Sequence, residues 1–270
     1  MSDTIKFAKY TGAGNDFIII DNRTGGFSAE NSDRIRDMCA RRVSVGADGL
    51  ILLENSDKAD IRMRSFNSDG SEAEMCGNGA RCLIDFARRK GLGSRTIKLE
   101  TMERVLTAHV EGADIYVEMG EVVDTQLNID IEIEGRTYHV HYTNTGVPHA
   151  VMFVDDVSKV EVVGLGRKVR FHQRFQPKGT NANFVQVTGR DSISARIYER
   201  GVEDETLASG TGCTACAVIS SLVKGVQPPI RVQTRGGAIL TINFKEQDDR
   251  FSDVTMTGPT RLVYEGIYFP

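Results

Sequence analysis

Short runs of apolar and β-branched residues recur along the whole chain, separated by glycine, asparagine, aspartate and charged residues. In the first half these runs cover residues 5–10, 17–21, 50–53, 61–66, 96–100 and 115–119. In the second half they cover residues 137–142, 150–154, 184–187, 193–198, 230–233 and 238–244. Runs of this length and composition predict β-strands, so both halves are expected to be rich in sheet.

Two segments depart from this pattern and resemble each other. Each has a small nucleophile-type residue followed by Gly-X-Gly, at Cys76 and at Ser209, and then runs into apolar, helix-favouring sequence. Each predicted helix ends at a glycine preceded by lysine, Gly91 and Gly225, which is a usual stop signal. Both helices carry apolar residues on most faces, so each is expected to be buried inside a sheet.

The two turns are 209 − 76 = 133 residues apart, close to half of the 270-residue chain, which indicates an internal duplication. We therefore predict an α+β fold of two similar domains related by a pseudo-two-fold axis. Each domain is a curved, barrel-like sheet, mixed or antiparallel, around one central helix. The predicted domains are residues 1–120 and 121–258, with residues 259–270 forming a further strand.

Composition restricts the classes of function. A hydrophobic fraction of 40% and a charged fraction of 26% are ordinary for a globular protein. The net charge of −4 and the absence of a lysine and arginine cluster give no support to a nucleic-acid partner. The start, MSDTIKFAKY, has no apolar signal region, and apolar runs such as residues 17–20 are too short to span a bilayer. We expect no membrane partner and a cytoplasmic location.

The five cysteines, an odd number without the spacing of small secreted proteins, are expected to be thiols and not disulfides. Cys39, Cys82 and Cys216 are interpreted as small buried residues. Cys213 and Cys216 form a C-x-x-C pair, which could suggest zinc or a redox dithiol. No second pair accompanies it, so we predict no metal.

The two glycine-led turns suit proton removal from the α-carbon of an amino acid. Without an electron-sink cofactor, that reaction needs a base on one face, a proton donor on the other and strong stabilisation of the carboxylate. A cysteine thiol has an ordinary pKa of about 8.5, which a helix N-terminus lowers. The same N-terminus offers N–H groups to a carboxylate, and the glycines allow close approach. Cys76 fits this role, and the Ser209 turn fits it in geometry.

Residues 67–82 (NSDGSEAEMCGNGARC) and 198–212 (YERGVEDETLASGTG) resemble the two signatures of the diaminopimelate epimerases. Five shorter pieces also match in family order: residues 11–17, 46–50, 148–150, 178–184 and 257–259. Seven motifs in register cover nearly the whole chain, which makes the resemblance specific.

The resemblance implies a role for each matching residue. Cys76 is one catalytic thiol, and Ser209 stands where the family has the second. His149 and Glu199 match residues that manage the protonation of the two thiols. The side chains that match the binders of the substrate's distal groups are Asn15, Asn67, Asn181 and Arg200. The turns whose amides clamp the reacting carboxylate match Gly77, Asn78, Gly210 and Thr211.

The resemblance further implies a cofactor-independent epimerase that interconverts LL- and meso-2,6-diaminopimelate in lysine and peptidoglycan biosynthesis. It needs neither metal nor pyridoxal phosphate. Its site lies between the two domains, its partner is the small amino-acid substrate, and homodimers are possible. The strand at residues 259–270 is expected to return to the first domain.

Ser209 is the main departure from the family pattern. A hydroxyl is a far weaker acid than a thiol and will not act as an alkoxide base near neutral pH without unusual help. Either an engineered replacement or a natural variant with altered chemistry explains it, and we expect slow epimerisation. Val147 stands where many members have asparagine, which bears on the substrate.

Three other functions stay open on the sequence alone. One is a racemase of another amino acid, such as histidine, or a one-base dehydratase with the same fold. Another is a non-catalytic amino-acid binding protein that keeps the pocket, and the third is a thiol-metal protein.

Overall fold

The computed structural model describes residues 4–73, 76–102, 104–247 and 250–270. Residues 74 and 75 of the first signature lie outside this part. By its internal contacts the chain divides into unit 1, Met1–Val117 with Gly258–Pro270, and unit 2, Glu118–Thr257. The boundary near residue 120 expected from the sequence lies close to this division.

Unit 1 is built from nine strands and two helices within the described residues. The strands are β1 (Ile5–Gly12), β2 (Asn15–Asp21), β3 (Gly49–Glu54), β4 (Ile61–Asn67), β5 (Glu72–Ala73), β6 (Thr96–Glu100), β7 (Val105–Glu111), β8 (Asp114–Glu118) and β18 (Thr260–Tyr268). The helices are α1 (Ser32–Cys39) and α2 (Gly77–Arg89). Strands pair in the order β18, β1, β2, β3, β4, β6, β7, β8, with β5 beside β4. The β2–β3 and β4–β6 pairs are parallel and the others antiparallel.

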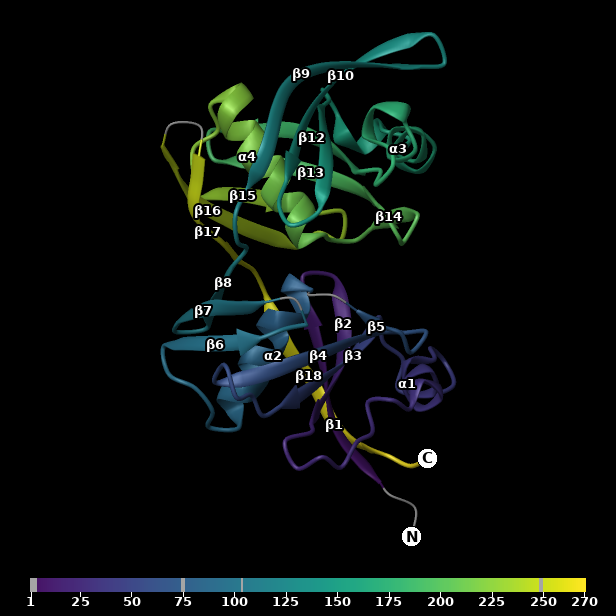
Figure 1. Ribbon diagram of the computed structural model, residues 1–270, viewed down its shortest axis with the longest axis vertical. Coiled ribbons are helices and arrows are strands. Elements are labelled where there is room, and N and C mark those ends of the chain that lie inside the picture. Colours follow the sequence, from purple (N-terminus) through teal and green to yellow (C-terminus); the bar gives the residue numbers. More distant parts are fainter. Residues whose placement is uncertain (1–3, 74–75, 103, 248–249) are drawn as a thin grey trace. The chain divides into compact units, whose positions relative to one another are not determined.

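Helix α2 runs inside this sheet, which bends around it (Figure 1). It contacts β1, β2, β3, β4 and β18. Leu83, Ile84 and Ala87 are fully buried in a cluster shared with the strands. Burying a side chain of leucine size contributes about 1.5–3 kcal/mol, so the apolar sequence of this helix is explained by its central position.

Unit 2 repeats the plan. Its strands are β9 (Val123–Ile133), β10 (Arg136–Asn144), β11 (Pro148–Phe153), β12 (Asn181–Gly189), β13 (Ser192–Glu199), β14 (Asp204–Thr206), β15 (Ile230–Gln233), β16 (Ile239–Gln247) and β17 (Arg250–Thr257). Its helices are α3 (Val162–Arg170) and α4 (Gly210–Lys224), with 3₁₀ turns η1 (Val157–Lys159) and η2 (Gln173–Phe175). The pairing order is β9, β10, β11, β12, β13, β15, β16, β17, with β14 beside β13.

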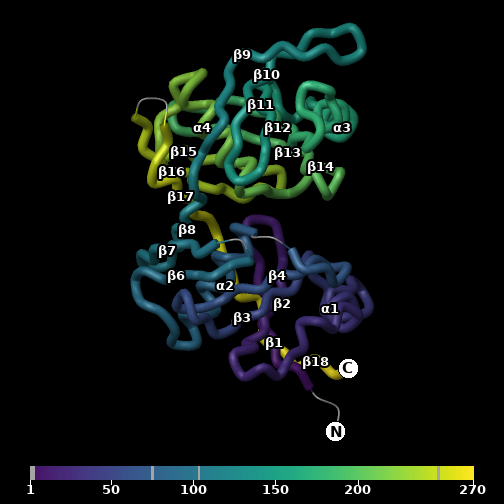
Figure 2. The backbone as a smooth tube through the Cα atoms, viewed as in Figure 1, coloured from purple at the N-terminus to yellow at the C-terminus, as the bar shows by residue number. Residues whose placement is uncertain are grey.

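The match between the units extends to strand direction. The third and fourth strands of each order, and the fifth and sixth, are parallel, and the rest antiparallel. The central helix α4 contacts β10, β11, β12, β13, β15 and β16. This shared plan supports the predicted duplication, and the backbone trace shows the central helices α2 and α4, each among the strands of its own unit (Figure 2). The predicted α+β architecture of a curved sheet around a buried helix, made twice, is confirmed.

The predicted strands are all present, with bounds shifted by up to three residues, and the tail forms β18, which pairs with β1. Helices α1 and α3 and strands β5, β7, β9, β14 and β17 were not predicted. Helix α3 carries two glycines, and Gly166 lies so close to Tyr198 that an added Cβ would be 2.5 Å from its Cβ. Strand β9 is mostly exposed and polar. Local sequence therefore concealed α3 and β9, whereas β7 has the alternating pattern of a strand. In the described part of the chain, no helix has the length and apolarity needed to cross a membrane.

Candidate functional site

The first turn of α2 is held tightly against its sheet. Cys76 is the N-cap, and Gly77 and Asn78 are buried. A Cβ on Gly79 would lie 2.8 Å from Ile51 Cδ1, and one on Gly12 would lie 2.7 Å from Cys82 Sγ. Glycine at position 79 lets the start of the helix approach β3, and glycine at position 12 lets it approach β1.

A chain of hydrogen bonds joins this turn to Asn15. Arg81, which is fully buried, donates to Asn78 Oδ1 (2.7 Å) and to the Gly77 carbonyl (3.3 Å). Asn78 Nδ2 donates to Asn15 Oδ1 (2.8 Å), and Asn15 Nδ2 donates to Asp48 Oδ2 (3.2 Å). The structure thus brings Asn15 and Asn78 together. Arg81 and Asp48 complete the network and were not assigned roles from sequence, although both lie in recognised motifs.

Asn67 lies at the same end of the sheet as Asn15. It ends β4 opposite Gly49, which in turn lies opposite Phe17 near the start of β2. Its side chain is exposed and donates to Ser71 Oγ (3.0 Å). Strand pairing therefore places Asn67 at the same end of the sheet as Asn15.

The first turn of α4 has the same backbone start. Ser209 is the N-cap with φ −131° and ψ 119°, and Cys76 has φ −112° and ψ 113°. The Ser209 hydroxyl accepts a hydrogen bond from the Gly212 N–H (3.3 Å). A Cβ on Gly210 would lie 3.0 Å from Met256 Sδ. The Thr211 carbonyl accepts from Thr145 Oγ1 (3.1 Å), so this turn too is fixed by its neighbours.

His149 is wholly buried on β11, next to Asn181 in the parallel pairing of β11 and β12. Burial lowers its pKa to about 3, because a charged imidazolium would lose its hydration. Its Nδ1 lies 3.3 Å from Asn183 Nδ2. Its Nε2 has no hydrogen-bond partner among the described residues. At neutral pH the ring is therefore uncharged.

Asn181 fixes the loop that carries Arg200. Its Nδ2 donates to the Pro148 carbonyl (2.9 Å), and its Oδ1 accepts from the Arg200 backbone N–H (2.7 Å). The Arg200 guanidinium donates to the Lys178 carbonyl (3.1 Å). Glu199 precedes Arg200 at the end of β13, and burial raises the pKa of its carboxyl. The motif thus places a buried carboxyl and an arginine next to each other in the sequence at the end of β13.

The predicted residues fall into two groups. Cys76, Gly77, Asn78, Asn15 and Asn67 lie at one end of unit 1. The group in unit 2 contains Ser209, Gly210, Thr211, His149, Asn181, Glu199 and Arg200. Cys76 and Ser209 are the N-caps of the central helices of the two units.

The remaining thiols differ from Cys76. Cys39, Cys82 and Cys216 are buried, which confirms that they pack as small core residues. Burial raises the pKa of Cys39 to about 11 and of Cys82 to about 12. Cys76 is only partly buried. Within the described ranges, no group of three or more His, Cys, Asp or Glu side chains is arranged to hold a metal ion.

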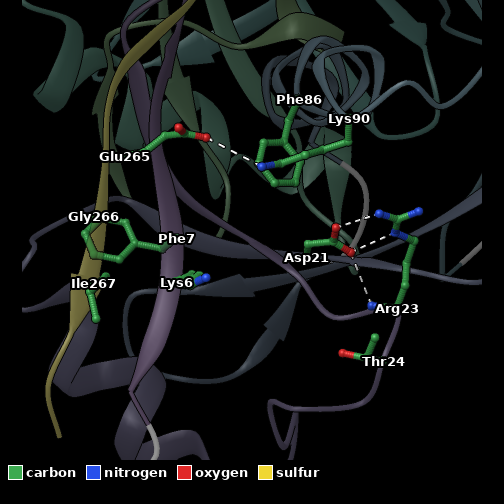
Figure 3. A pocket seen from close by; sticks show the side chains of 10 residues that line it. All are labelled: Lys6, Phe7, Asp21, Arg23, Thr24, Phe86, Lys90, Glu265, Gly266 and Ile267. Atoms are coloured by element: carbon green, nitrogen blue, oxygen red, sulfur yellow. Dashed lines mark hydrogen bonds and ion pairs between the residues drawn. The ribbon is translucent and has the colours of Figure 1, made fainter.

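A cavity of about 710 Å³ lies elsewhere in unit 1, lined by Phe7, Phe86, Lys90, Glu265 and Ile267 among others (Figure 3). Lys90 is the C-cap of α2, the helix that begins at Cys76. The cavity is therefore at the opposite end of α2 from the proposed chemistry, and its size does not make it the reaction site.

A family model described as diaminopimelate epimerase matches residues 7–125 and 141–263. A protein named diaminopimelate epimerase from Aquifex aeolicus (strain VF5) is 45% identical over 280 residues, covering 97% of each chain. The chain belongs to the diaminopimelate epimerase family. Another relative of that name, from Hydrogenobaculum sp. (strain Y04AAS1), is 41% identical over 272 residues and covers 96% of each chain.

Solved structures of proteins with low sequence identity to this chain have the same fold. A Bacillus anthracis phenazine biosynthesis protein of the PhzF family has a TM-score of 0.76 at 16% identity, with 99% of each chain covered. An Agrobacterium vitis hydroxyproline epimerase with bound trans-4-OH-L-proline has a TM-score of 0.71 at 13% identity, covering 100% of this chain and 94% of that one. At such identities the likeness concerns the fold alone.

Proposed function

We propose that this chain is a cofactor-independent isomerase that interconverts LL- and meso-2,6-diaminopimelate, in lysine and peptidoglycan biosynthesis. The family membership supports it, since the relatives carry that name over almost their full length. The observation that carries the proposal is the pair of glycine-led helices, whose N-caps Cys76 and Ser209 have matching backbone conformations in units of the same plan.

In the proposed reaction, the Cys76 thiolate takes the α-proton on one face and a donor at position 209 returns a proton on the other. The electron pair left on the α-carbon spreads into the carboxylate, which the N–H groups of both helix N-termini stabilise. Asn15, Asn67, Asn181 and Arg200 would bind the distal ammonium and carboxylate groups. His149 and Glu199 would adjust the protonation of the two acid–base positions, and closure of the site would exclude water.

Ser209 limits this reaction, because a hydroxyl exchanges its proton with carbon far less readily than a thiol. Positioned acid–base groups typically contribute about 10²- to 10⁴-fold to a rate. We therefore expect Ser209→Cys to raise the rate of inversion of LL-diaminopimelate by about that factor. The measurement follows α-proton exchange in heavy water together with chiral separation of the products.

Ser221→Cys is the matched control, because it adds a thiol to the same helix at its other end. It should leave the rate unchanged. Equal inversion rates with serine and with cysteine at position 209 would refute the two-thiol mechanism. Tight substrate binding without exchange in either variant would indicate a binding protein. Rapid turnover of a mono-carboxylate amino acid alone would indicate another racemase.

We also propose a cytoplasmic protein that forms homodimers. The five thiols suit a reducing compartment. Strand β18 exposes Val263, Tyr264 and Ile267, and Ile267 also lines the cavity at the end of α2. An exposed apolar strand beside a cavity is a candidate contact surface for a second copy.

A further inference from the structure

Asn183 connects His149 with the turn that carries Ser209. It is fully buried on β12. Its Nδ2 lies 3.3 Å from His149 Nδ1, and its Oδ1 lies 2.9 Å from where a Cβ on Gly212 would be. The Gly212 N–H in turn donates to Ser209 Oγ. The Asn183 side chain therefore lies against both His149 and Gly212 of the Ser209 turn.

The orientation of the Asn183 amide follows from its third neighbour. Nδ2 lies 2.8 Å from the Ala150 carbonyl oxygen, which can only accept a hydrogen bond. The amide nitrogen, and not the amide oxygen, must therefore face Ala150. The other hydrogen of this nitrogen has two acceptors in reach, and His149 Nδ1 (3.3 Å) is nearer than the Asn181 carbonyl oxygen (3.5 Å). A donor facing Nδ1 requires a lone pair on that atom, so the ring proton belongs on Nε2.

We propose that Asn183, which lies against both His149 and Gly212, is a positioning residue that holds His149 as the neutral tautomer protonated on Nε2, so that His149 offers a hydrogen-bond donor and not a base. The role of His149 in catalysis rests on the proposed function, whereas its tautomer does not depend on that function. His149 Nε2, buried and without a partner among the described residues, then carries a proton that is available for a hydrogen bond.

The close contact at Gly212 gives the second part of the argument. A side chain there would strike Asn183 Oδ1 and Ile197 Cδ1, which would be 2.9 and 2.6 Å away. The glycine lets α4 begin directly against the amide that orients His149. Asn183 Oδ1 also lacks a partner in the described part of the chain, which leaves one donor and one acceptor in the same buried region.

The first test reads the tautomer in the parent protein. Nitrogen-15 NMR of histidine-labelled protein at neutral pH distinguishes a protonated ring nitrogen from one with a lone pair, and His149→Gln identifies the His149 signals. We expect a lone pair on Nδ1 and a proton on Nε2. A proton on Nδ1, or an imidazolium, would overturn the proposal.

The second test is Asn183→Asp, which places an oxygen where Nδ2 was. That oxygen carries at most one hydrogen, which the Ala150 carbonyl would take, so it should accept from His149 Nδ1. We expect the ring proton to move to Nδ1. In the Ser209→Cys background, we expect kcat to fall about 10-fold or more with a smaller change in KM. An unchanged tautomer in a folded Asn183→Asp protein would contradict the assignment.

The chain contains its own controls. His141 Nδ1 accepts from the Asn128 backbone N–H (3.2 Å), and His172 Nδ1 accepts from the Arg174 backbone N–H (3.1 Å). Both should keep their tautomers in the variant. His139 Nδ1 faces the Asp130 carboxylate and supplies the reference signal for an Nδ1 that donates. The NMR signals do not depend on turnover. A wrong tautomer assignment can therefore be distinguished from a wrong assignment of the epimerase reaction.

Discussion

Burial decides what identical side chains can do in this protein. Cys76 is the N-cap of α2, and Cys82 lies within the same helix. Cys82 is fully buried and its pKa is raised to about 12, whereas Cys76 is partly accessible. The same holds for histidine. His149 is wholly buried, and His139 lies exposed on β10. Only the partly accessible thiol at a helix start is suited to exchange protons with a substrate.

Burial of His149 should make folding depend on pH. Its pKa is lowered from 6.5 to about 3, so between these values the unfolded chain binds a proton that the folded chain does not. The free energy of unfolding should therefore fall as the pH falls below 6.5, by up to about 1.4 kcal/mol per pH unit. Urea unfolding at pH 7, 6 and 5 measures this slope.

The comparison of His149→Gln with the exposed-residue variant His139→Gln isolates the effect. His149→Gln should have a shallower slope, and His139→Gln should keep that of the parent. Above pH 7 the contribution of His149 is fully present, so the curves should run parallel there. Equal slopes for all three proteins between pH 6 and 5 would show that His149 is hydrated in the folded state.

At the scale of the element, the two central helices begin alike and differ in their caps. The Ser209 hydroxyl accepts a hydrogen bond from the Gly212 N–H, as serine usually does at an N-cap. A thiol is a weak acceptor. Serine at position 209 therefore suits helix α4 better than it suits proton transfer, and stability and chemistry oppose each other at this residue.

We expect Ser209→Ala to lower the free energy of unfolding by about 1 kcal/mol, the usual loss for a serine cap. Ser209→Cys should lose a similar amount while it raises the inversion rate. Urea denaturation compares both with Ser252→Ala, an exposed serine on β17, which should be nearly neutral. A Ser209→Cys protein as stable as the parent would show that the hydroxyl does not cap the helix.

At the scale of the whole molecule, one plan is used twice and completed by a strand from far along the chain. β18 pairs with β1 over the full length of β1, from Ile5 opposite Tyr268 to Gly12 opposite Thr260. Residues on its outer surface remain exposed, with Ile267 at 51%. The exposed face of β18 is therefore the place to test the contact of the proposed homodimer.

A charge at this surface should dissociate the dimer. We expect Ile267→Lys to convert the protein to a monomer in sedimentation velocity, because a buried unpaired ammonium is costly. Ile239→Lys is the matched control, since Ile239 begins strand β16 and is 50% exposed. It should leave the dimer intact. A parent protein that sediments as a monomer, or an Ile267→Lys dimer, would exclude this surface.

The sequence by itself determined the two glycine-led helices, most strands of both sheets and the family, because these depend on local turn chemistry, residue periodicity and motif order. It did not reveal α1, α3 or strands β5, β7, β9, β14 and β17. Strand β9 is mostly polar and exposed, and the glycines of α3 are explained only by contacts such as that of Gly166 with Tyr198. Tertiary structure alone decided that His149 is uncharged, that Arg81 is wholly buried, and that Asn183 lies between His149 and the Ser209 turn. Those properties depend on burial and on which distant groups meet, and adjacent residues in the chain do not encode either.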